Sequence, residues 1–125
     1  MGRNRSYNED EVLTKCAAQF LQTGYEGTSI DDLVTATGLH RGSLYSAFGS
    51  KRGIFLAVLA QLASTGMRDT EFADLVLVAL LELAPRDEGV RELTARILAD
   101  TANLGTPESL GSRLLARAHL PTASE

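Results

Sequence analysis

Three glycines divide the first half of this chain into short segments that each carry a helical pattern. Apolar side chains recur every three or four residues from about residue 9 to residue 62, and Gly24, Gly38 and Gly49 each interrupt that pattern. Glycine commonly follows the last residue of a helix, because it adopts a left-handed backbone without steric cost. Strand signals, such as alternating β-branched runs and Asn-Gly or Asp-Gly turns, do not stand out. The pattern therefore predicts an all-α protein.

Capping residues set the expected boundaries of the helices. Ser29 and Ser50 are good N-caps, and acidic side chains follow residue 8 and Ser29, where the helix dipole favours negative charge. The predicted fold is a three-helix helix-turn-helix domain in residues 1–62, followed by a short helical domain in residues 63–125. The helices that we expect cover residues 9–23, about 29–37, about 40–48, a longer segment after Ser50, and then about 70–84, 88–104 and 107–119.

The sequence lacks the signals of secreted and membrane proteins. Its longest apolar run, Leu75–Leu81, is far shorter than the roughly 18 residues that span a bilayer. Residues 1–20 have no uninterrupted apolar core of a signal peptide. The single cysteine, Cys16, can form neither an internal disulfide nor a cysteine-based zinc site, and its helical spacing predicts a packed, inert thiol. We therefore expect a cytoplasmic protein.

Charge is distributed unevenly between the two halves. The net charge of the chain is −4, yet residues 1–68 hold seven basic and six acidic side chains, whereas residues 69–125 hold five basic and ten acidic ones. This asymmetry predicts that an anionic partner would meet the first half of the molecule.

Residues 29–48 have the layout of a helix-turn-helix unit. A helix of about two turns, a bend at Gly38 and a second short helix follow one another, and helices this short need neighbours to bury their apolar faces. A helix, tight turn and helix supported by a third helix presents its second helix to the major groove of DNA. The layout favours double-stranded DNA as the partner, although short helix pairs also occur in plain helical bundles.

The second helix of this unit has an exposed face suited to nucleic acid. Leu44 and Phe48 lie one turn apart and should face the core. An arginine at the tip of the helix can bind a guanine edge or a phosphate, and hydroxyl groups can contact either. A glycine inside the helix costs about 1 kcal/mol relative to alanine, which is explained if a partner approaches the backbone closely. The residues expected on the exposed face include no acid, and they are His40, Arg41, Gly42, Ser43, Tyr45 and Ser46.

Two cations lie where a helix start disfavours them. Lys51 and Arg52 follow the expected N-cap Ser50, at the positive end of the helix dipole. An anion bound at this helix start would resolve the conflict, and a DNA phosphate is the natural candidate. The alternative is a pair of solvated, screened side chains.

Three motifs in this half resemble the DNA-binding domain of TetR (tetracycline-repressor) family regulators. They are residues 20–29 (FLQTGYEGTS), 38–45 (GLHRGSLY) and 48–51 (FGSK), and the resemblance covers about residues 9–62. It implies a homodimeric repressor that binds a palindromic operator. It also implies that Ser29 and Tyr45 hold phosphates, that Lys51 anchors the DNA backbone, and that His40, Arg41 and Ser43 contact bases. The basic arm of Arg3 and Arg5 would add further contacts.

The chain departs from this family in three respects. Ala47 stands where a histidine is frequent, and Asp31 stands where some members have a basic residue, so we expect modest DNA affinity. Only about sixty residues follow the resembling segment, fewer than in the usual C-terminal domain of the family. We expect the last two helices to form a dimer interface. A small-molecule effector pocket has weak support, because so few helices leave little room for one.

Sequence motifs for catalysis are missing. The chain has no Gly-x-Ser-x-Gly elbow, no His-Glu-x-x-His pair and no phosphate-binding glycine loop, so neither an enzyme nor a cofactor is expected. His40 and His119 lack partners at the spacing of zinc ligands. Two rivals to a DNA-binding regulator stay open: a helical interaction protein that pairs with other regulators and binds DNA weakly or not at all, and a regulator that also senses a small molecule.

Overall fold

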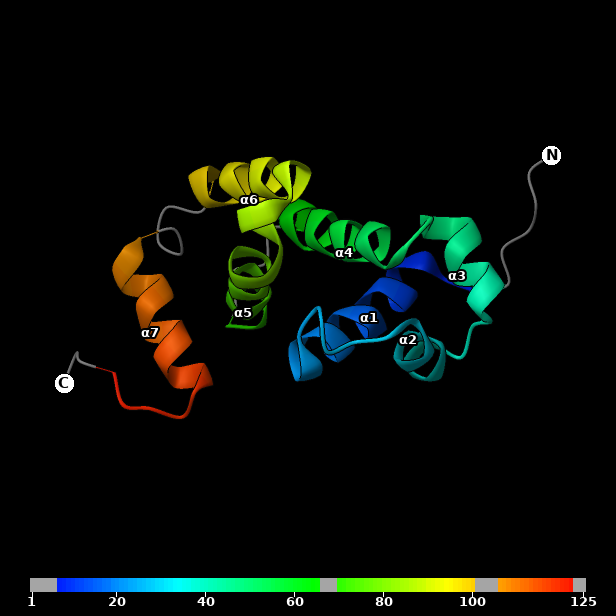
Figure 1. The fold of residues 1–125 in the computed structure, drawn as a ribbon, viewed down its shortest axis with the longest axis horizontal. Coiled ribbons are helices and arrows are strands. Elements are labelled where there is room, and N and C mark those ends of the chain that lie inside the picture. The colour runs from blue at the N-terminus through cyan, green and yellow to red at the C-terminus, as the bar shows by residue number, and fades with distance from the viewer. Residues whose placement is uncertain (1–6, 66–69, 101–105, 123–125) are drawn as a thin grey trace. The chain divides into compact units, whose positions relative to one another are not determined.

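The computed structural model describes residues 7–65, 70–100 and 106–122, and these form α-helices and turns without any strand. The chain divides into two compact units, Met1–Gln61 and Leu62–Glu125, which are considered separately below (Figure 1). The prediction of an all-α protein is confirmed for the described part of the chain. None of its helices is long and apolar enough to cross a membrane.

The first unit contains α1 (Glu9–Thr23), α2 (Ile30–Thr37), α3 (Arg41–Phe48) and most of α4 (Lys51–Thr65). Its core is aromatic at one end, where the rings of Phe20 and Phe55 meet edge to face with centroids 5.0 Å apart. Leu33 of α2 and Leu44 of α3 are also fully buried. Each of the two short helices is therefore held by a leucine in a core to which the longer helices contribute most of the apolar surface.

Local capping fixes where these helices begin and end. Asn8 accepts a hydrogen bond from the Glu11 amide at the start of α1. At the start of α2, Ser29 and Asp32 form a reciprocal capping box, as the sequence Ser-x-x-Asp allows. Gly38 and Gly49 end α2 and α3 with positive φ angles of 78° and 87°. The glycine boundaries predicted from the sequence are confirmed.

The second unit contains α5 (Thr70–Val78), α6 (Glu88–Asp100) and α7 (Pro107–Arg117). A continuous helix predicted over residues 70–84 was wrong, because α5 gives way to a π-helical segment (Ala79–Leu83) and then a 3-10 turn (Ala84–Arg86). Pro85 lies in that turn and has no amide hydrogen to continue an α-helical ladder. The apolar run Leu75–Leu81 is buried as expected up to Ala79, whereas Leu81 in the π-helical segment is 59% exposed.

An ion pair joins two helices of the second unit. Nε and one terminal nitrogen of Arg113 on α7 donate to the two carboxylate oxygens of Asp74 on α5, at 3.0 and 3.1 Å. Arg117, one turn further along α7, lies 3.6 Å from the same carboxylate. The unit is therefore held by a two-pronged polar contact in addition to apolar packing.

Candidate nucleic-acid interface

The turn between α2 and α3 is fixed by two local hydrogen bonds. The Gly38 amide donates to the carbonyl of Val34 at 2.8 Å, and the Leu39 amide donates to the hydroxyl of Thr37 at 3.2 Å. His40 then adopts an extended conformation as the N-cap of α3. Because α2, turn and α3 follow within twenty residues and share one core, they form a helix-turn-helix unit with α3 as its second helix.

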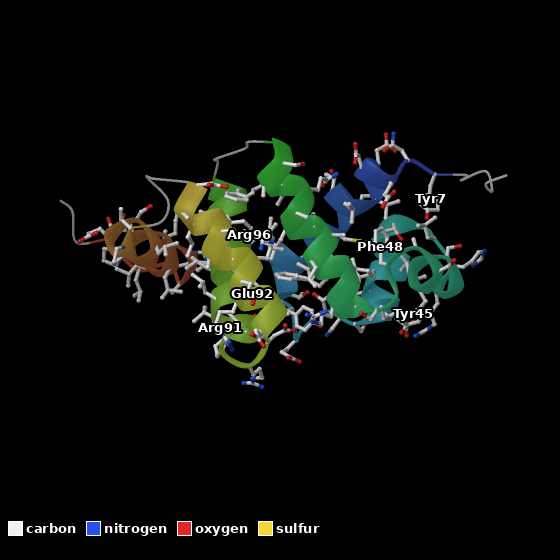
Figure 2. The ribbon with its side chains drawn as sticks, turned by 90° about the horizontal axis from the view of Figure 1, so that it is seen from above. Tyr7, Tyr45, Phe48, Arg91, Glu92 and Arg96 are labelled. Carbon is white, nitrogen blue, oxygen red and sulfur yellow. The ribbon has the colours of Figure 1, made fainter. Side chains whose placement is uncertain are left out.

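The exposed face of α3 carries most of the residues that the sequence singled out. His40, Arg41, Gly42, Tyr45 and Ser46 are exposed, whereas Ser43 is half-buried. Figure 2 shows Tyr45 and Phe48 leaving α3 on different sides; Tyr45 is 40% exposed and Phe48 is half-buried. The structure thus brings these α3 residues together on one helix of eight residues, where a partner could contact them simultaneously.

Among the described residues, nothing in the packing requires a glycine at position 42. A Cβ atom added there would meet nothing within 4 Å, and its φ angle is outside the positive region occupied by Gly24, Gly38 and Gly49. Alanine would therefore fit, and it would favour the helix. A glycine at this position leaves room for something outside the described part of the chain.

Ser29 lies at the start of α2, where its side chain works for the fold. Its hydroxyl accepts from the Asp32 amide at 3.0 Å, and its own amide donates to the Asp32 carboxylate at 2.9 Å. The residue is exposed, and a capping hydroxyl still has its hydrogen available to donate. A phosphate contact by Ser29 remains a prediction that this geometry permits.

Lys51 turns toward its own chain. Its ammonium nitrogen lies 3.0 Å from the carbonyl oxygens of both Tyr25 and Thr28, and 4.3 Å from the centre of the Tyr25 ring. These carbonyl dipoles and the ring face offset the positive charge at the start of α4. The sequence suggested that a bound anion would offset the unfavourable position of a cation at this helix start. For Lys51, the loop between α1 and α2 does so instead.

Buried hydroxyl contacts and a sterically crowded glycine support that loop. Thr28 is a fully buried polar residue; its hydroxyl bonds to the carbonyl of Gly24 and lies 2.6 Å from the hydroxyl of Thr23. Gly27 is required by space, because an added Cβ would lie 2.3 Å from the Thr23 carbonyl oxygen. Two glycines and two threonines at positions 23–28 were the only signal of a tight, internally bonded loop.

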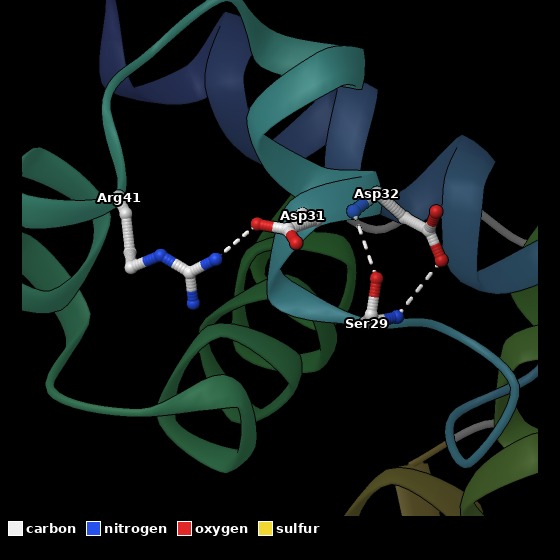
Figure 3. A network of polar contacts seen from close by, with 4 residues as sticks. All are labelled: Ser29, Asp31, Asp32 and Arg41. Atoms are coloured by element: carbon white, nitrogen blue, oxygen red, sulfur yellow. Dashed lines mark hydrogen bonds and ion pairs between the residues drawn. The ribbon is translucent and has the colours of Figure 1, made fainter.

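Arg41 forms a contact that sequence reasoning missed. A terminal nitrogen of its guanidinium donates to the carboxylate of Asp31, across the turn between α2 and α3 (Figure 3). Both side chains are largely exposed, at 52% and 76%.

The predicted basic arm of Arg3 and Arg5 lies outside the described residues, and Arg52 is exposed on α4.

The remaining chemistry of the described residues is inert. Burial raises the pKa of the Cys16 thiol to about 11, so the thiol stays protonated at neutral pH and is a poor nucleophile. No group of three or more potential metal ligands occurs in the part of the chain that the structure covers. This part of the molecule therefore offers a binding surface on α3 as its candidate site.

The first half of the chain is similar to known regulatory proteins. Residues 12–58 match the family described as "Bacterial regulatory proteins, tetR family". The chain is 42% identical over 59 residues to the HTH-type transcriptional regulator YezE of Bacillus subtilis, covering 47% of this chain and 30% of that protein. It is 47% identical over 58 residues to the HTH-type transcriptional repressor ComR of Escherichia coli, covering 46% of this chain and 28% of that protein. The chain thus spans less than a third of the length of these two relatives.

A solved structure extends the similarity beyond the matched segment. The TetR family transcriptional regulator CifR, in a cysteine mutant complexed with a 26-base-pair operator DNA, matches with a TM-score of 0.57 at 25% sequence identity. The match covers 99% of this chain and 79% of that chain.

Proposed function

We propose that this chain, whose residues 12–58 match the tetR family of bacterial regulatory proteins, is a transcription regulator that binds double-stranded DNA in a sequence-specific manner. In this proposal it acts in the cytoplasm as a repressor rather than as an enzyme. Support comes from the relatives, since ComR is a transcriptional repressor and CifR was solved with operator DNA.

The observation that carries this proposal is the exposed face of α3. It presents one cation, one imidazole and a phenol around Gly42, a glycine that the packing of the described residues does not require. Arginine and hydroxyl groups are the usual donors to base edges and phosphates. Acidic residues are absent from α3 itself, so the helix can enter a groove without like-charge repulsion between its own side chains and phosphates.

In this proposal His40, Arg41 and Ser43 contact bases, Ser29 and Tyr45 bind phosphates, and the DNA backbone passes close to Gly42. Lys51 contributes by holding the loop that precedes α2 through its bonds to the Tyr25 and Thr28 carbonyls, and it supports the DNA-facing surface without binding a phosphate itself. Ser43 is half-buried, so its hydroxyl reaches a base only if the groove lies close to α3.

We further propose that the regulator works as a homodimer on a palindromic site. Two recognition helices related by a two-fold axis read two half-sites about one helical turn of DNA apart. Exposed leucines in and just after α7 support a partner surface in the second unit: Leu114, Leu115 and Leu120. This assembly is a proposal for the whole chain, which spans only part of the length of its relatives.

Selection of DNA by the purified full chain tests the function. Duplexes from a random-sequence library are enriched by the wild type and by Arg41→Ala at near-physiological salt. The wild type should enrich a palindromic motif, and Arg41→Ala should lose about 1–3 kcal/mol of discrimination at one position per half-site. Absence of enrichment by the wild type would favour the rival interpretation, a helical protein that pairs with other regulators, and the mass of the chain mixed with such regulators would then be measured.

A further inference from the structure

Asp31 of α2 and Arg41 of α3 meet on the exposed side of the helix-turn-helix unit. We propose that Asp31 is a specificity-determining residue: by holding the Arg41 guanidinium, it directs Arg41 toward a base edge and away from phosphates. This inference rests on the proposed DNA-binding function and adds a residue whose side chain need not touch DNA.

The frame behind the pair is rigid. The capping box of Ser29 and Asp32 fixes the first turn of α2, where Asp31 lies. The bonds of the turn at Gly38 and Leu39 fix the start of α3, where Arg41 is the first residue. The two side chains therefore extend from backbone positions that are each held by local hydrogen bonds, so that their pairing has a defined geometry (Figure 3).

Stability does not explain the pair. Both side chains are more than half exposed, and ion pairs in such positions contribute little to folding because water and salt screen them. The capping box of α2 uses Asp32, so Asp31 is not needed for it. A carboxylate in the first turn of α2 is also favoured by the helix dipole, but Asp32 already supplies one there. Asp31 in addition lies beside the arginine best placed to contact a base.

The pairing changes what Arg41 can bind. A phosphate carries a full negative charge and is repelled by the Asp31 carboxylate, whereas the N7 and O6 acceptors of guanine are uncharged. The pair engages one terminal nitrogen of Arg41, and Figure 3 shows the other terminal nitrogen turned away from Asp31. A guanidinium held in this way keeps N–H groups for a base edge while its attraction to the DNA backbone falls.

Asp31→Asn tests the proposal, because it removes the charge and keeps the shape. Affinities are measured for a duplex enriched by the wild type and for a scrambled duplex of the same composition, over a range of salt concentrations. We expect the ratio of the two affinities to fall by about 3- to 10-fold. We also expect the salt slope on the scrambled duplex to steepen by about one unit, as for one added phosphate contact. Asp31→Ala, as a second variant, should lower the ratio in the same direction, and circular dichroism checks that both variants keep their helices.

Two comparisons isolate the pair from a general effect of charge. In the Arg41→Ala background, Asp31→Asn should leave the affinity ratio unchanged, because the side chain that Asp31 directs is gone. Glu92→Gln removes the same charge from an exposed position of α6 in the second unit, and it should leave the ratio at the wild-type value.

Distinct outcomes would overturn the inference and the proposed function. If Arg41→Ala lowers the ratio but Asp31→Asn raises both affinities equally, the DNA-binding function stands and Asp31 is only a repulsive charge. The same conclusion follows if the ratio falls equally in both backgrounds. If the wild type enriches no duplex, the proposed function fails and the role of Asp31 falls with it.

Discussion

The ammonium group of Lys51 donates to the backbone carbonyls of Tyr25 and Thr28, each at 3.0 Å, and lies over the Tyr25 ring. These contacts join the start of α4 to the loop between α1 and α2, across more than twenty residues of chain. The Tyr25 ring in turn meets Phe20 and Phe55, with centroids 6.0 and 5.4 Å away. Lys51 is therefore tied to the same aromatic cluster that supports the helix-turn-helix unit.

We predict that Lys51→Met destabilises the fold by about 1–2 kcal/mol. The substitution removes charge-assisted hydrogen bonds to the partly buried carbonyls of Tyr25 and Thr28. DNA affinity should fall in proportion to the fraction of molecules in which α2 is no longer folded. The salt slope of binding should stay unchanged. Chemical denaturation gives the first quantity, and titrations at several salt concentrations give the second.

Lys15→Met is the matched control, since Lys15 is exposed on α1 and its loss should cost less than about 0.5 kcal/mol. A salt slope that drops by about one unit in Lys51→Met, with stability retained, would instead assign Lys51 to a phosphate.

Gly42→Ala separates the needs of the fold from the needs of the partner. Nothing lies within 4 Å of the added methyl group, so the variant should gain up to about 1 kcal/mol of stability from better helix propensity. If DNA approaches the α3 backbone here, the same variant should bind its selected duplex several-fold more weakly. Thermal denaturation and DNA titration on one protein sample measure both.

Gly111→Ala provides the comparison, because Gly111 also has open space around it and lies inside α7 in the second unit. It should raise stability by a similar amount without changing DNA binding. Wild-type affinity in Gly42→Ala would show that the backbone at this position does not approach DNA.

The limits of sequence reading lie in contacts that cross from one element to another. Glycine positions and caps act within a few residues, so the boundaries of α1 to α3 could be predicted, including the end of α2 at Gly38. The exposed face of α3 followed from its periodicity for the same reason. The partner of Lys51 could not be predicted, because a cation at a helix start can meet an anion, water or distant carbonyls, and only the fold selects among them.

The pairing of Arg41 with Asp31 escaped prediction for a related reason. The two residues are ten positions apart, and no helical repeat brings such positions together; only the angle of the turn does. In the second unit, the apolar run through Leu81 gave no sign that the helix widens into a π-helical segment after Val78. Apolar periodicity reports that a segment is buried, but it does not report how its backbone accommodates the proline that follows.

Cys16 should report on opening of the first unit. Because burial raises its pKa from 9.0 to about 11, the native thiol should react with a maleimide at pH 7.5 at least a hundredfold more slowly than in denaturant. Linkage gives the pH dependence: between pH 9 and about 11 the unfolded thiol loses its proton while the folded thiol keeps it. Stability is unaffected below pH 9 and falls by up to about 2–3 kcal/mol across that window.

Denaturation of wild type and Cys16→Ala at pH 8 and pH 10.5 isolates this contribution from other alkaline titrations. The difference in stability between the two proteins should shift in favour of Cys16→Ala at the higher pH. An equal loss in both proteins, together with fast labelling of the native wild type, would mean that the thiol is accessible.

The bidentate contact between Asp74 and Arg113 should govern the stability of the second unit. Asp74→Asn leaves the volume unchanged but removes the charge that holds Arg113 and attracts Arg117. Because these side chains are mostly sheltered, at 16% exposure for Asp74 and 28% for Arg113, we expect a loss of about 1–2 kcal/mol, more than for an open surface pair. Hydrogen exchange should rise in α5 and α7 while protection of α1 to α3 is kept.

Glu108→Gln, an exposed change in the first turn of α7, should leave exchange near the wild-type pattern. If α7 carries the proposed dimer surface, Asp74→Asn should also weaken dimerisation, which sedimentation at several protein concentrations would detect; a dimer of unchanged strength with a loosened α7 would place the interface elsewhere.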